Sequence, residues 1–119
     1  MFNLMKKAVT VTMLALLVAG AAFAQERFAR GGKYRVEAQQ KDLFAVKFNA
    51  GQEAAIYVKG DGDTDLDLYI FDENANLMGK DEDDTDECLV RFHPRESGKF
   101  VVVVVNRGRV YNDYQLAIS

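Results

Sequence analysis

The chain has 119 residues, of which 49% are hydrophobic and 28% charged, and its formal net charge is −3 at neutral pH. This length is enough for one small domain, so it excludes a large multi-domain enzyme. Beyond the first 24 residues there is no apolar stretch of about 20 residues, which excludes a polytopic membrane protein.

The first residues have the three parts of a secretory signal peptide. Two lysines precede an apolar run at 8–22, and Ala-Phe-Ala at 22–24 gives the small-x-small pattern of a cleavage site. The run is shorter than the roughly 20 residues that span a bilayer, and a membrane anchor is the alternative reading. We predict that residues 1–24 are removed, and that the product is secreted or periplasmic with no membrane attachment.

Charge in the predicted mature chain is unevenly distributed. Removal of 24 from 119 residues leaves 95, and since two of the 15 bases are lost, 13 bases face 18 acids, a net charge of −5. Residues 61–87 hold twelve of these acids and one base. Nucleic-acid binding needs a basic stripe and is not expected. An acidic lobe favours binding of a cation or of a basic partner, or it serves only to keep the protein soluble.

The mature chain contains short segments of β-branched and aromatic residues separated by turn residues, and no long stretch with helical periodicity. After a flexible arm at 25–32, a single domain at 33–119 is predicted. Eight strands at spacings of roughly 8–12 residues are typical of an antiparallel β-sandwich of jelly-roll type, an all-β fold. The predicted strands are 33–38, 43–48, 54–58, 66–71, 77–80, 88–93, 100–105 and 114–118.

Two segments carry more specific predictions. Valines fill 101–105 without polar alternation, which predicts a strand covered on both sides. In the strand at 66–71, three aliphatic residues face the core, so Tyr69 and Phe71 lie opposite them, either exposed or covered by a neighbouring element. The single cysteine, Cys88, cannot form an internal disulfide and is expected to be a buried small hydrophobe.

An ordered set of motifs resembles the bacterial pre-peptidase C-terminal (PPC) domain family. FNAGQ is similar to that family's F-x-A-G-Q turn, and DTDLDLYI to its D-x-D-L-D-L-Y-V strand. ENANL matches a D/E-N-G-N-L hairpin, with Ala75 where glycine is usual. The other segments resemble F-x-P-x-x-S-G-x-Y and Y-x-x-Y-x-L. In chain order, the five lie at 48–52, 63–70, 73–77, 92–100 and 111–116.

The resemblance implies a β-sandwich of jelly-roll type, which in that family is usually appended to secreted proteases. It extends to the collagen-binding modules of clostridial collagenases, which share the sandwich and bind calcium. This chain departs from the usual setting because the module takes up the whole predicted mature sequence. A stand-alone exported module is therefore expected.

Residue types for catalysis are few. His93 is the only histidine, and the mature serines are Ser97 and Ser119. No nucleophile, base and orienting group can be assembled from these residues, so we expect no enzyme. Carboxylates are abundant, so residue type alone does not exclude a glycosidase.

Acidic residues concentrate in two predicted loops, of which 61–67 leads into one strand and 81–86 lies between two others. These acidic loops predict a calcium site where they meet, because hard oxygen ligands favour calcium over zinc or copper. Calcium also accepts irregular geometry from loops. An EF-hand is rejected, since Leu66 stands where that loop needs glycine. A solvated acidic surface is the alternative. The expected ligands are Asp63, Asp65, Asp67, Asp83, Asp84 and Asp86.

The function expected from these observations is an exported, stand-alone, non-catalytic PPC-like module that acts in binding or stabilisation. Its partner would be a protein or polysaccharide that the sequence does not identify. The alternatives are a carbohydrate- or matrix-binding module, or a small secreted hydrolase or protease inhibitor.

Overall fold

The computed structural model describes residues 31–119 as eight strands and their connections. The predicted signal peptide and most of the predicted arm lie outside the described residues. The first strand begins at Gly31, two residues before the predicted start. The strands are β1 (Gly31–Val36), β2 (Lys41–Phe48), β3 (Ala54–Lys59), β4 (Leu66–Asp72), β5 (Leu77–Asp81), β6 (Glu87–Phe92), β7 (Gly98–Asn106) and β8 (Asn112–Ile118).

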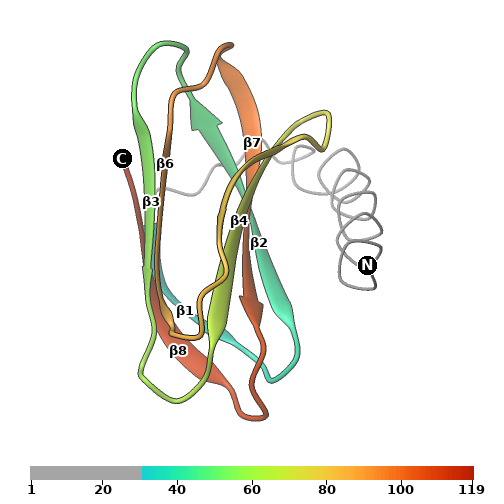
Figure 1. Cartoon of the computed structure of the whole chain (residues 1–119), viewed down its shortest axis with the longest axis vertical. Coiled ribbons are helices and arrows are strands. Elements are labelled where there is room, and N and C mark those ends of the chain that lie inside the picture. Colours follow the sequence, from blue (N-terminus) through green and yellow to red (C-terminus); the bar gives the residue numbers. More distant parts are fainter. Residues whose placement is uncertain (1–30) are drawn as a thin grey trace.

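The strands form two four-stranded antiparallel sheets that face each other (Figure 1). Sheet A has the order β1-β8-β3-β6 and sheet B the order β2-β7-β4-β5. In each sheet the neighbours alternate between early and late strands, which is the connectivity of two Greek keys in a jelly roll. The predicted all-β sandwich is confirmed.

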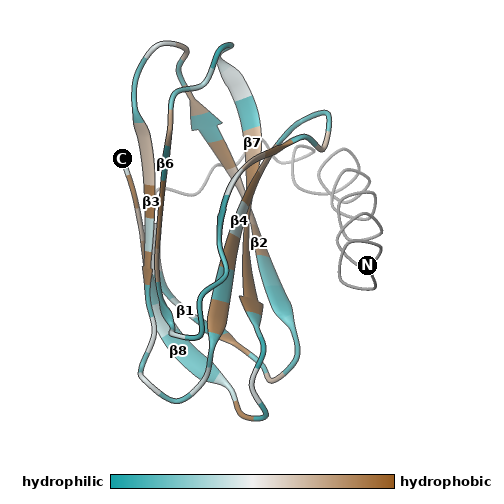
Figure 2. Cartoon of the chain, in the orientation of Figure 1, coloured by the Kyte–Doolittle hydropathy of each residue, from teal (hydrophilic) through white to brown (hydrophobic). Residues whose placement is uncertain are grey.

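The main core lies between the sheets and follows from the period-two alternation of the strands. Every sheet-A strand and three of the sheet-B strands contribute buried residues to it, and apolar segments run along the strands in Figure 2. Ile56, Leu66, Leu68, Ile70 and Val102 are all 0% exposed. Cys88 belongs to this core, as predicted, and is 1% exposed.

The valine run forms the interior of β7, which pairs with β2 on one side and β4 on the other. Val102 and Val104 enter the main core, whereas Val101 and Val103 belong to a second apolar cluster on the opposite side of sheet B. All four side chains are buried. The prediction that both sides of this strand are covered is therefore confirmed, and β5 is an edge strand.

Four loops gather at one end of the sandwich, which we call the acidic end. They are the β1–β2 loop at 37–40, the β3–β4 loop at 60–65, the β5–β6 loop at 82–86 and the β7–β8 loop at 107–111 (Figure 1). No helix long and apolar enough to cross a membrane occurs within residues 31–119.

Candidate functional site

Backbone hydrogen bonds join the two acidic loops. The Gly60 amide donates to the Asp86 carbonyl at 2.9 Å, and the Leu66 amide donates to the Thr85 carbonyl at 3.1 Å. The Gly62 amide adds a bond of 2.6 Å to Asp86 Oδ2. The expectation that these loops lie together is confirmed, although the bonded residues are 19 to 26 positions apart in the sequence.

A buried amide holds the junction in place. Asn112 is 0% exposed, and its Nδ2 donates to Asp86 Oδ2 at 3.1 Å and to Thr64 Oγ1 at 3.1 Å. A Cβ atom on Gly60 would lie 2.1 Å from Asp86 Oδ2 and 2.7 Å from Asn112 Oδ1. A side chain at residue 60 would therefore displace the Asp86 carboxylate and the Asn112 amide that hold this junction.

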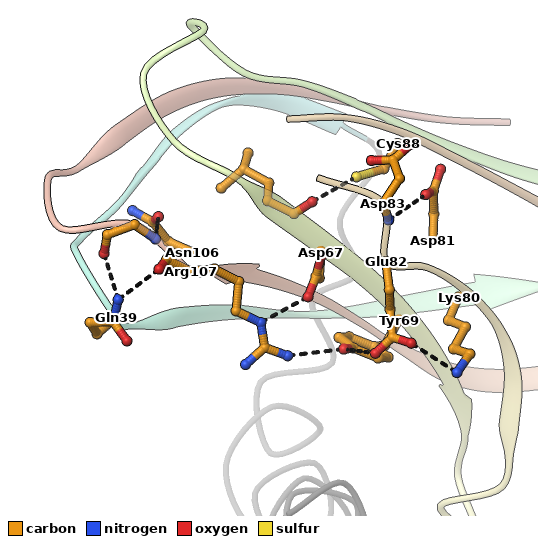
Figure 3. Close-up of polar contacts among 12 residues, drawn as sticks. Gln39, Asp67, Tyr69, Lys80, Asp81, Glu82, Asp83, Cys88, Asn106 and Arg107 are labelled. Atoms are coloured by element: carbon orange, nitrogen blue, oxygen red, sulfur yellow. Dashed lines mark hydrogen bonds and ion pairs between the residues drawn. The ribbon is translucent and has the colours of Figure 1, made fainter. Parts of the chain in front are cut away.

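A polar network extends from the acidic end onto the outer side of sheet B (Figure 3). Arg107 Nε donates to Asp67 Oδ2 at 2.8 Å, and Arg107 Nη2 donates to the Tyr69 hydroxyl oxygen at 3.0 Å. The Tyr69 hydroxyl donates to Glu82, whose other oxygen lies 2.8 Å from Lys80 Nζ. Asp67 is 5% exposed, and its cationic partner in this network is Arg107.

Sequence reasoning did not find Arg107, because it lies in a predicted turn 40 residues from its partner. No local motif connects the two positions. Their proximity arises because β4 and β7 are antiparallel neighbours, with Leu66 opposite Asn106 in the register. The pairing thus depends on tertiary structure alone.

Asp65 is the predicted ligand whose surroundings most favour a cation. Its Oδ1 is buried without a hydrogen-bond partner. Burial raises the pKa of the Asp65 carboxyl, and the charges of Asp67, Asp83 and Asp84 raise it further, while Arg107 opposes them. A bound cation would relieve both the desolvation and the repulsion.

The other predicted ligands already accept hydrogen bonds or lie at the surface. Asp83 Oδ1 accepts from the Thr85 amide at 3.0 Å and from its hydroxyl at 2.8 Å. Asp63 and Asp84 are exposed. Within residues 31–119, no three Asp, Glu, His or Cys side chains are grouped closely enough to hold a metal ion. Calcium binding, which needs these side chains to converge further, stays a prediction.

The residues considered for catalysis lie apart. His93 is exposed just after β6, whereas Ser97 Oγ accepts a bond of 2.8 Å from the Ala50 amide. The Cys88 thiol donates to the Leu66 carbonyl at 3.2 Å. Burial, reinforced by nearby carboxylates, raises the pKa of that thiol to about 12, so it is protonated at neutral pH.

A cleft of about 270 Å³ lies between the β4–β5 turn and the β6–β7 turn. Phe100 and Met78 contribute apolar surface, and Arg95, Lys99 and Glu73 contribute charge of both signs. The cleft therefore combines apolar side chains with charges of both signs.

No model of a known protein family matches the chain, and no curated protein sequence matches it either. Solved structures do match its fold. The pre-peptidase C-terminal domain of a collagenase from Bacillus anthracis gives a TM-score of 0.64 at 13% sequence identity, covering 75% of this chain and 87% of that one. A β-sandwich module similar to this domain is therefore established, without sequence evidence for the family.

Two other solved structures show the same fold. A mitogen derived from Yersinia pseudotuberculosis gives a TM-score of 0.63 at 10% identity, covering 78% of this chain and 85% of that one. PliG from Aeromonas hydrophila, a periplasmic inhibitor of g-type lysozyme, gives 0.53 at 17% identity, covering 82% and 91%. At these identities the likeness is one of fold alone.

Proposed function

We propose that this protein is an exported, non-catalytic β-sandwich module of PPC type that acts by binding a macromolecule or stabilising it. The observation that carries the proposal is the extent of the fold likeness. The collagenase PPC domain matches over 87% of its own length, and in this chain that match accounts for most of the described sandwich. In the proposal, binding surfaces on this rigid frame carry the function.

The lack of a catalytic arrangement among the described residues supports a binding role. His93 is exposed, Cys88 is buried and protonated, and Ser97 is engaged in a turn. Carboxylates are the abundant functional groups that remain. In our proposal they serve solubility and calcium binding at the acidic end, with Asp65 as the first ligand to test.

A panel of immobilised ligands tests the proposal. Fibrillar collagen, cellulose and peptidoglycan would be incubated with the exported protein, and both bound protein and released product would be measured. Saturable retention without product supports a binding module. Product release that disappears when one acidic residue, such as Asp65→Asn or Asp83→Asn, is changed would instead establish a hydrolase. Arg95→Ala in the cleft, with Arg91→Ala as a matched exposed control, locates the contact.

A second function, inhibition of a secreted hydrolase, is favoured by the match to PliG over 91% of that protein. Its test is inhibition of g-type lysozyme and of secreted proteases by the purified protein. Stoichiometric inhibition would select this function over binding to collagen or polysaccharide.

Export is part of the same proposal. Mass spectrometry of protein recovered from the periplasm or the medium should give Gln25 as the first residue, because the Ala-Phe-Ala pattern ends at residue 24. Recovery of a membrane-bound chain that still begins at Met1 would contradict export by cleavage.

A further inference from the structure

The outer face of sheet A, the side away from sheet B, presents its side chains in rows that run across the four strands. Residues paired in register share a row, and successive rows on this face lie about 7 Å apart along the strands. The middle row is apolar and consists of Gly31, Ala117, Tyr57 and Leu89. Leu89 is 45% exposed, and Ala117 is exposed on the other side of Tyr57.

Tyr57 lies near the centre of this row and is partly exposed. Its hydroxyl donates to Glu87, which belongs to the next row on the neighbouring strand β6. A ring that reaches a diagonal neighbour leans along the sheet instead of standing out from it. On the β8 side, Ala117 and Gly31 have too little side chain to cover the ring. Together these residues form a flat apolar platform.

Cations flank the platform on both sides. Lys33 and Lys59 lie in the next row toward the acidic end, each opposite Gln115 on β8, so they are two strand spacings or about 10 Å apart. Arg91 lies in the row on the other side of the platform, opposite Ala55. All three cations are exposed, and none of them is in an ion pair within residues 31–119.

The two carboxylates that the strands of sheet A contribute to this face are already engaged. Asp113 accepts from Arg35 Nε at 2.7 Å and from its Nη2 at 3.0 Å, while Glu87 accepts from the Tyr57 hydroxyl. Four bases against two acids give these strands an outer face of net charge +2, in a chain whose formal net charge is −3. The face therefore favours an anionic ligand.

We propose that this face binds an acidic polysaccharide, which lies across the strands with its sugar rings on Tyr57 and its carboxylates toward Lys33, Lys59 and Arg91. The inference rests on the proposed binding function and names its ligand. A pyranose ring has C–H groups on its faces and polar groups at its rim, so it matches a flat aromatic platform bounded by charge. The four strands span roughly 14 Å, which leaves room for several contacts along one chain.

A membrane surface fits this face less well. Insertion between lipid headgroups needs an apolar surface that sinks below them. Here the Tyr57 ring is tethered along the sheet, and its neighbours Ala117 and Gly31 are small. Leu89 is the only large aliphatic residue of the row.

Binding to immobilised polygalacturonate tests the proposal, with its fully methyl-esterified form as a neutral polymer of the same backbone. Chelator is present throughout, so that calcium cannot bridge the polymer to the acidic end. We expect the exported protein to bind polygalacturonate saturably, to release it as salt is raised, and to bind the ester about tenfold more weakly. Equal binding of the two polymers overturns the proposal. Failure to bind polygalacturonate also overturns it, but leaves function by binding intact if collagen, cellulose or peptidoglycan is retained.

Charge reversal at two matched lysines locates the site. Lys33→Glu changes an exposed lysine on β1, an edge strand of sheet A, and should weaken binding about tenfold at low salt. Lys47→Glu changes an exposed lysine on β2, an edge strand of sheet B, and should have little effect. Equal losses in the two variants would show attraction by overall charge and overturn the proposal.

Tyr57 provides a readout that charge alone would not move. Tyr57→Ala should weaken binding about tenfold at low and high salt alike, because ring stacking is not screened, whereas Tyr57→Phe keeps the ring and should keep most of the affinity. Circular dichroism would establish that both variants are folded. A folded Tyr57→Ala protein with unchanged affinity overturns the proposal.

Two further comparisons separate this face from other sites. Arg91→Ala should weaken binding of polygalacturonate, whereas Arg95→Ala should not, and the reverse pattern would place the contact in the cleft and overturn the proposal. Retention on vesicles of phosphatidylglycerol and phosphatidylcholine, without retention on polygalacturonate, would identify a lipid surface as the ligand and overturn it as well.

Discussion

Substitution of Val102 provides a sharp test of the fold. Val102 is 0% exposed and lies opposite Phe44 on β2 and Ile70 on β4, so it is enclosed on all sides by the main core. Val102→Ala removes two methyl groups at about 0.8 kcal/mol each in transfer free energy, and the incompletely filled cavity adds to this. We expect the free energy of unfolding to fall by about 2–3 kcal/mol.

Val102→Asp should be far more damaging. It loses the same apolar surface and places an unpaired carboxylate in the core, which costs at least several kcal/mol. At about 0.05–0.15 kcal/mol per residue, the 89 described residues have a total stability of roughly 4–13 kcal/mol. The aspartate variant should therefore be largely unfolded at neutral pH and recover partly in acid, where the carboxyl is neutral.

Urea unfolding followed by far-ultraviolet circular dichroism measures both effects, and the chain has no tryptophan to serve as a probe. Val110→Ala is the matched control, because Val110 is 52% exposed and the same change there should cost less than about 0.5 kcal/mol. Equal losses at Val102 and Val110, or a near-native midpoint for Val102→Asp, would refute the assignment of β7 as the central strand.

Three further outcomes follow from particular residues. Ala75 has φ of 65°, so Ala75→Gly should stabilise the β4–β5 turn by about 0.5–1 kcal/mol in thermal unfolding, whereas Ala117→Gly in β8 should destabilise. Because folding raises the pKa of Asp65, the stability that its protonated carboxyl provides is lost as pH rises through that pKa. In chelator, Asp65→Asn should therefore raise the melting temperature at pH 7 but not below pH 3.8, the ordinary Asp value. Asp113→Asn should show the opposite sign, because Arg35 lowers the pKa of Asp113. Calcium at about 10 mM should stabilise the fold by about 1.4 kcal/mol if it binds with a millimolar dissociation constant, and an unchanged melting temperature leaves the solvated-surface alternative.

Much of the fold could be predicted from local patterns, because strand alternation and uninterrupted valines directly reflect which sides of a strand are covered. The run at 101–105 indicated a doubly covered strand, and the structure places it at the centre of sheet B. The aspartate and glycine residues at 60–65 indicated a loop, and Gly60 proves to be the point where two loops cross.

The arrangement of the acidic end could not be predicted in the same way. Charge density shows that acids are close in sequence, but it does not show which base approaches them. Arg107 reaches Asp67 from a loop 40 residues away, and the buried Asn112 joins loops that no short motif relates. The Arg107 contact depends on the strand register between β4 and β7, and the Asn112 contacts depend on the position of β8 in sheet A, both properties of the assembled sandwich.

Calorimetric titration of the exported protein against the macromolecules of the binding panel tests the central claim, function by binding, most directly. The account predicts discrete heats that return to baseline after each injection and saturate at a fixed stoichiometry for one macromolecule. Sustained heat release whose rate scales with protein concentration, accompanied by product, would show turnover and contradict the account.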